Sequence, residues 1–252
     1  MTIQKFEVPD WIRSVLICDP TDIWGNVVGM GLAELAAVIC PAKRFDRRGN
    51  LILWDNFEFG LARWDVTEGG TLAEVSLSTT IITSGGYSVK LTAGSDGLQY
   101  ARIRHRHLHP VAGRVGVEIS FTLHTNTSKM RFWLQFFDGI NQQAYAIQYD
   151  AVANTLSYKT TAGAWTTFVA DLDLPYLDTL FHTLKFVVDI ENQKYVRCLF
   201  NRNEYDLLTY VPHITTDTTL ESMMIAIEHI SKAGTNPHSY VDDLILTQNE
   251  PA

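Results

Sequence analysis

The chain has 252 residues, of which 46% are hydrophobic and 11% aromatic, so it can bury one sizeable core. A formal net charge of −8 and a sequence pI near 5.4 argue against a nucleic-acid-binding protein, which would need a basic face. The first ten residues are polar and lack the apolar core of a signal peptide, which predicts a protein made in a cytoplasm and not secreted.

Residues 1–50 are predicted to form an extended arm followed by a short helix, because apolar residues recur at helical spacing between residues 23 and 39. This segment carries Glu34 and is shorter than the roughly 20 residues of a membrane span, so we expect no membrane contact. An arm and one helix cannot bury their apolar side alone. They therefore dock on a neighbouring subunit or form a lid over the chain's own β-domain. The expected interface residues are Trp11, Ile12, Trp24, Val28, Leu32 and Leu35.

Residues 51–252 are predicted to form one antiparallel β-sandwich, since short alternating segments are separated by turn residues at even spacing. The clearest segment is 114–123, and segment 130–137 is apolar on both faces. Segment 130–137 is therefore a central strand covered on both sides, or its outer aromatic residues bind a ligand. The predicted strands are 51–54, 75–77, 84–91, 99–109, 114–123, 130–137, 144–149, 155–160, 164–169, 182–190, 195–199, 204–207, 223–227 and 240–246.

Segment 182–207 carries a short motif in two halves. The first half is His182, Leu184, Lys185 and Asp189, and the second is Tyr195, Arg197, Asn201 and Glu204. These residues resemble the last strands of concanavalin A-like or laminin G-like jelly rolls, which implies an all-β antiparallel jelly roll. Because this architecture hosts lectins, hydrolases and structural proteins, the resemblance implies a fold and not an activity.

Two further motifs resemble carbohydrate-binding-module-like sandwiches. They are D-x-F-E-x-G-x-x-x-W at residues 55–64 and S-G-x-Y-S-x-K-L at residues 84–91, where Tyr87, Val89 and Leu91 are expected to face the core. The last strand, 240–246, resembles the closing strand of the same sandwiches and is expected to pair near the first one. The resemblance covers residues 51–248, about four-fifths of the chain.

The resemblance implies a structural calcium site. Glu58, the turn at residues 83–86, and Asp242 or Asp243 occupy positions that often hold this ion in such folds, and oxygen ligands suit it. The alternative is that the closing-strand carboxylates accept hydrogen bonds from backbone amides. No other cofactor is expected.

Sugar binding would need exposed aromatic residues on the concave sheet, beside polar side chains. The candidates for stacking are Trp133, Tyr145, Tyr149, Tyr158 and Trp165, of which the alternating pattern requires at least half to be core residues.

The sequence predicts no enzyme. Sandwich glycosidases place two carboxylates on one strand face, and the nearest match, Glu204-Tyr205-Asp206, lacks the further glutamate because Thr209 follows. His105, His107 and His109 alternate on one strand, where they form a metal site or a polar outer face.

The overall pattern resembles virion structural proteins of tailed bacteriophages, namely capsid decoration or tail proteins. This implies a non-catalytic, homo-oligomeric protein in the virion that docks on other capsid or tail subunits through residues 1–50. The alternative is a lectin-like module that binds a glycan.

Overall fold

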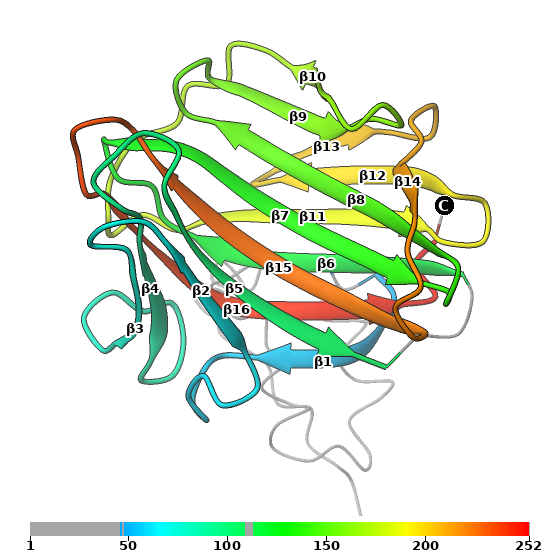
Figure 1. Cartoon of the computed structure of the whole chain (residues 1–252), viewed down its shortest axis with the longest axis horizontal. Coiled ribbons are helices and arrows are strands. Elements are labelled where there is room, and N and C mark those ends of the chain that lie inside the picture. Colours follow the sequence, from blue (N-terminus) through cyan, green and yellow to red (C-terminus); the bar gives the residue numbers. More distant parts are fainter. Residues whose placement is uncertain (1–45, 47, 109–112, 252) are drawn as a thin grey trace, which may run out of the picture. The chain divides into compact units, whose positions relative to one another are not determined.

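A computed structural model describes residues 46, 48–108 and 113–251 of the chain. The compact unit from Arg48 onward consists of two antiparallel sheets stacked face to face (Figure 1). The predicted arm and helix, with the six expected interface residues from Trp11 to Leu35, lie outside the described residues. No helix in the described part is long and apolar enough to cross a membrane.

The first sheet, sheet A, has eight strands in the order β13-β12-β11-β6-β16-β4-β3, with β1 paired to β16 beside β4. Its strands are β1 (Asn50–Asp55), β3 (Glu74–Ser78), β4 (Ser88–Thr92), β6 (Arg114–Phe121), β11 (His182–Asp189), β12 (Lys194–Phe200), β13 (Asn203–Asp206) and β16 (His238–Gln248). The pairing of the first and last strands is as expected from the sequence, and it closes the sheet along β16.

The second sheet, sheet B, has eight strands in the order β10-β9-β8-β7-β15-β5-β2, with β14 paired to β8 beyond the end of β9. Its strands are β2 (Asp65–Gly69), β5 (Tyr100–His107), β7 (Thr127–Phe137), β8 (Asn141–Asp150), β9 (Thr155–Lys159), β10 (Trp165–Val169), β14 (His213–Thr216) and β15 (Ser222–Ser231). The strands β2 and β14 were not predicted, because each is short and largely exposed.

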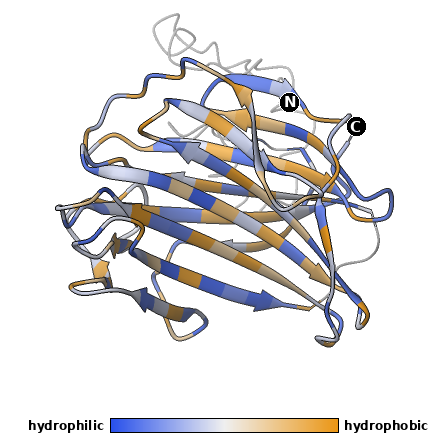
Figure 2. Ribbon diagram, turned by 45° about the horizontal axis from the view of Figure 1, so that its top comes forward, coloured by the Kyte–Doolittle hydropathy of each residue, from blue (hydrophilic) through white to orange (hydrophobic). Residues whose placement is uncertain are grey.

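The core lies between the two sheets, and period-two alternation builds it. On β6 the inward residues from Val115 to Phe121 are at most 2% exposed, as the sequence predicts. On β7 the inward set is Met130, Phe132, Leu134 and Phe136. Hydrophobic and hydrophilic residues accordingly alternate along the strands in Figure 2.

One predicted strand begins later than expected. Segment 84–91 was predicted as a strand with Tyr87 in the core, but β4 starts at Ser88 and Tyr87 is 39% exposed. The reason is that the carboxylates of Asp242 and Glu58 accept the backbone N–H groups of Thr83, Ser84, Gly86 and Tyr87, so these groups are not available to a sheet.

Candidate functional site

The outer face of sheet B, turned away from the core, is built by the residues that alternate with the buried ones. On β7 the alternation sends Arg131, Trp133 and Gln135 outward, and on β5 it sends Arg102, Arg104 and Arg106 outward. Strand β15 lies between β5 and β7, so its outward residues are flanked by side chains from both.

A continuous polar row crosses this face at one level of the strand register. From β2 to β10 it consists of Thr67, Arg102, Glu228, Arg131, Gln148, Ser157 and Thr167. Glu228 forms two ion pairs, one from Oε1 to Arg131 Nη1 at 3.0 Å and one from Oε2 to Arg102 Nη1 at 3.6 Å. Arg131 Nε also donates a hydrogen bond to Gln148 Oε1 at 2.8 Å. The Glu228 side chain is 8% exposed, whereas those of Arg102 and Arg131 are 26% and 24% exposed. The two guanidinium groups therefore remain accessible to a ligand.

Two indole rings and two cations form a cluster beside this row. The rings of Trp133 and Trp165 meet edge to face, with centroids 5.7 Å apart. Lys159 Nζ lies over both rings at 5.4 and 5.2 Å, and the guanidinium of Arg131 lies 5.3 Å from the Trp165 centroid. Burial, with a further contribution from the charge of Arg131, lowers the pKa of Lys159.

Further cations lie toward β5. Arg106 is exposed, donates to Ser222 Oγ at 3.0 Å, and lies over the ring of Phe137 at 5.5 Å. Arg104 lies across from Asp65 in the register, and its Nε is buried with no hydrogen-bond partner among the described residues. This face therefore carries guanidinium donors that the described part of the chain leaves unused.

The structure separates the predicted stacking aromatics into two groups. Trp133 and Trp165 are half-buried on the outer face, whereas Tyr145, Tyr149 and Tyr158 lie on the inner face and pack in the core. The Tyr145 hydroxyl donates to Gln143 Oε1 at 2.9 Å, and burial raises its pKa above the usual range. Since sheet A covers the three tyrosines, Trp133 and Trp165 are the stacking candidates that remain.

The predicted calcium ligands surround the turn at residues 83–86. Glu58 Oε1 accepts the N–H groups of Gly86 and Tyr87 at 2.6 and 3.0 Å. Asp242 Oδ2 accepts those of Thr83 and Ser84 at 2.6 and 3.2 Å, and burial raises the pKa of Asp242. The carboxylates thus accept hydrogen bonds from backbone amides, which is the alternative to calcium binding considered in the sequence analysis.

Asp243 completes that arrangement. Its Oδ1 accepts the Ser84 hydroxyl at 2.5 Å, and its backbone φ of 50° lies in an irregular part of β16, where two successive carboxylates reach the same turn. Within the described residues, no group of three or more His, Cys, Asp or Glu is arranged to hold a metal ion. Calcium binding stays a prediction.

The structure also locates the candidate metal-binding histidines and the glutamate of the incomplete glycosidase motif. The rings of His105 and His107 lie 6.2 Å apart, and their Nδ1 atoms contact backbone carbonyls at 2.9 Å, while His109 lies outside the described residues. Glu204 lies on sheet A, where both of its carboxylate oxygens accept hydrogen bonds from Arg48 at 3.0 and 2.9 Å.

Sequence reasoning overlooked the arginines and Glu228. A signal was present, because Arg102, Arg104 and Arg106 repeat at period two and so must lie on one face of a strand. The pairing with Glu228 and Arg131 carried no signal, since these residues are far apart in the chain and meet only through the strand order.

The strand order and the layered core define the fold as an antiparallel sandwich of two eight-stranded sheets. Neither the family models nor the curated proteins include a match to this chain.

Solved structures do match it. A cellulose-induced protein, Cip1, is 16% identical with a TM-score of 0.53, over 78% of this chain and 97% of that one. An endo-β-1,4-glucuronan lyase from the fungus Trichoderma reesei is 11% identical with a TM-score of 0.56, over 79% and 96% of the two chains. A Bacillus licheniformis β-glucanase is 14% identical with a TM-score of 0.49, over 80% and 99%. At these identities the two matches with TM-scores above 0.5 establish the fold and not the activity.

Proposed function

We propose that this chain is a carbohydrate-binding protein and that it holds a glycan on the outer face of sheet B. The observation that carries the proposal is the Trp133–Trp165 pair, which lies next to a row of hydrogen-bonding side chains on a sheet face. Indole rings offer apolar area to a sugar ring, and neighbouring guanidinium and amide groups bind its oxygens. The names of the matched structures, which include a β-glucanase and a glucuronan lyase, support carbohydrate as the ligand class.

We propose binding without catalysis. Among the carboxylates on the described part of the face, Glu228 is held by two arginines and Asp150 is held by Lys129 Nζ at 2.6 Å, while Asp65 lies apart from both on the edge strand β2. A glycosidase needs one carboxyl group that can give up a proton and a second that can attack or activate water. Carboxylates fixed in ion pairs are poorly suited to the first of these roles.

The Trp133→Ala variant tests the site. We expect its dissociation constant for the bound glycan to rise about tenfold, as measured by affinity electrophoresis or calorimetry after a screen of soluble polysaccharides, since a lost stacking surface is worth about 1.4 kcal/mol. The matched control is Trp54→Ala, which removes a 55% exposed tryptophan from sheet A and should leave binding unchanged. If no glycan binds the full chain, or if both variants lose binding equally, the proposal fails.

The role in a phage particle, with homo-oligomerisation and docking on capsid or tail subunits, stays a prediction. It depends on residues 1–45, which lie outside the described part of the chain. It is compatible with glycan binding, because a particle protein can display a binding module.

A further inference from the structure

We propose that the glycan held on the outer face of sheet B is anionic, a polysaccharide that carries carboxylate or sulfate groups. This inference rests on the proposed function and narrows it to a substrate class. It follows from the juxtaposition of Arg102, Arg104, Arg106, Arg131 and Lys159 on one face of an acidic protein.

The charge of this face is opposite to that of the whole chain. Its five cations are accompanied by the carboxylates Asp65 and Glu228, and Asp217 lies near Arg106 at the rim. The Lys129–Asp150 ion pair at one end adds no net charge. The chain as a whole carries a formal charge of −8. A local excess of cations in such a protein attracts an anionic ligand to this face and repels it elsewhere.

The cluster of Trp133, Trp165 and Lys159 also favours an anionic ligand. Lys159 Nζ lies within 5.4 Å of both indole centroids, so a cation already covers the ring surface that a neutral sugar would use. A neutral sugar must displace this ammonium group and gains no charge interaction in return. An anionic sugar can keep it in place and pair with it, while its ring contacts the remaining exposed part of Trp133 or Trp165.

Arg104 supplies a binding group that is not used within the protein. None of the described side chains forms a hydrogen bond or ion pair with it, and its Nε is buried. A ligand cannot reach the buried Nε, but the Nη groups of this half-buried side chain are not buried and are open to a ligand that pairs with them. Carboxylate and sulfate groups fit the planar guanidinium with two parallel hydrogen bonds.

The experiment compares matched anionic and neutral glycans on the full chain. Polygalacturonate is paired with its fully methyl-esterified form, and dextran sulfate with dextran, so that each pair differs in charge on one backbone. We expect at least one anionic member to bind at least tenfold more tightly than its neutral partner at low salt, with most of the difference lost at high salt. Which pair shows the effect tells carboxylate from sulfate recognition.

The Arg104→Gln variant locates the site. It should weaken the anionic ligand about tenfold and leave the melting temperature unchanged, because the side chain pairs with nothing in the described residues. Arg202→Gln is the matched control, since Arg202 is exposed in the turn between β12 and β13 of sheet A. If Arg104→Gln fails to fold, Arg106→Gln is used in its place in the binding experiment, because Arg106 is exposed.

Four results would overturn the inference. Equal binding of anionic and neutral members, or preference for the neutral ones, would reject the charge selectivity and leave glycan binding intact. Equal loss in Arg104→Gln and Arg202→Gln would place the anionic ligand elsewhere. Single-stranded DNA that binds as tightly as the anionic glycans, with the same sensitivity to Arg104→Gln, would mean an unselective polyanion surface. Binding of no glycan at all would reject the proposed function together with this inference.

Discussion

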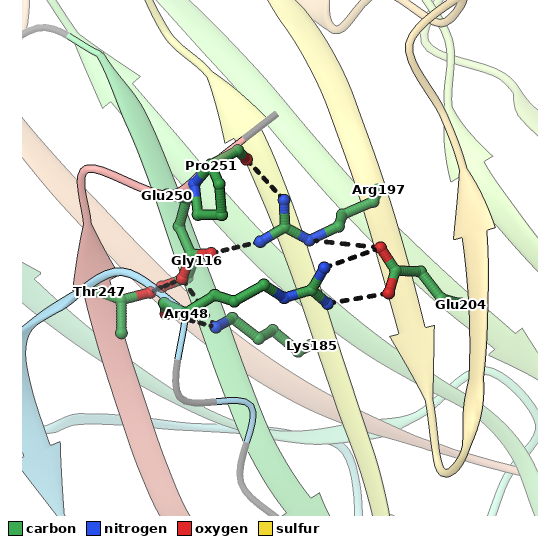
Figure 3. A network of polar contacts seen from close by, with 8 residues as sticks. All are labelled: Arg48, Gly116, Lys185, Arg197, Glu204, Thr247, Glu250 and Pro251. Carbon is green, nitrogen blue, oxygen red and sulfur yellow. Dashed lines mark hydrogen bonds and ion pairs between the residues drawn. The ribbon is translucent and has the colours of Figure 1, made fainter. Parts of the chain in front are cut away.

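Each sheet carries two cations that share one glutamate, and the two triads differ in burial. On sheet B, Glu228 pairs with Arg102 and Arg131, whose side chains are 26% and 24% exposed. On sheet A, Glu250 pairs with Lys185 and Arg197, whose side chains are 1% and 4% exposed (Figure 3). The same combination of charges is thus accessible to solvent on sheet B and is a buried structural contact on sheet A.

The buried triad joins the two ends of the described unit to the middle of sheet A. Lys185 Nζ lies 2.7 Å from Glu250 Oε1 and donates to the carbonyl oxygen of Arg48 at 3.2 Å. Arg197 binds the Glu250 carboxylate and donates to the carbonyl oxygen of Pro251 at 2.6 Å. These contacts tie the segment before β1 and the segment after β16 to the central strands β11 and β12.

Gly116 on β6 makes room for this triad. A Cβ at that position would lie 2.9 Å from Glu250 Oε1, 2.9 Å from Lys185 Cε and 2.7 Å from Thr247 Oγ1. The Thr247 hydroxyl itself donates to Glu250. The comparison teaches that the burial of the cations, and not the presence of an ion pair, distinguishes a structural triad from one that can meet a ligand.

The largest expected effect comes from breaking the buried triad. Glu250→Gln leaves Lys185 and Arg197 without their shared carboxylate, and we expect the free energy of unfolding to fall by about 3–5 kcal/mol in urea titrations. The control, Glu191→Gln, changes an exposed glutamate in the turn after β11 and should lie within about 0.5 kcal/mol of the wild type. A loss under 1 kcal/mol for Glu250→Gln would contradict the structural role.

The next effect concerns His229 on β15, which is buried and forms no ion pair with any residue that the structure describes. Its Nδ1 donates to the carbonyl oxygen of Leu91 at 2.9 Å and its Nε2 contacts Thr127 Oγ1 at 3.1 Å. Burial, with smaller contributions from His238 and His124, lowers the pKa of His229 to about 4.

Acid therefore destabilises the fold through His229. Above pH 6.5 the imidazole is neutral in both folded and unfolded chains, but between pH 6.5 and 4 only the unfolded chain binds the proton. Unfolding free energies should decrease by about 3 kcal/mol across this window, at roughly 1.4 kcal/mol per pH unit. His229→Gln should remove this part of the pH dependence, and an unchanged slope in that variant would refute the assignment.

The smallest stability effect is expected at the accessible triad. Glu228→Gln should change the free energy of unfolding by less than about 1 kcal/mol, because solvent screens the two partly exposed arginines. The same change removes a negative charge from the face and should tighten an anionic glycan at low salt. If Glu228→Gln destabilises the fold as much as Glu250→Gln does, the distinction between the two triads is lost.

Alternation in the sequence determined the sandwich itself. The segments around β6, β11, β12 and β16 were predicted within a few residues, because each has one clearly apolar face that must be buried. The closing pair β1–β16 followed from the resemblance and is present. The strands β2 and β14 were not recognised, since they are short and depend on pairing with β5 and β8 more than on their own residues.

The candidate site depended on tertiary structure to a larger extent. Segment 130–137 carries aromatic residues on both of its faces, so the sequence could not tell which of them point outward. Only the packing of sheet B against sheet A assigned Trp133 to the surface and, on the neighbouring strand β8, Tyr145 to the core. Glu228 likewise meets Arg102 and Arg131 because β15 lies between β5 and β7. Local pattern fixes which residues share a strand face, whereas the order of strands fixes which charges become neighbours, and that order is set by contacts far apart in the chain.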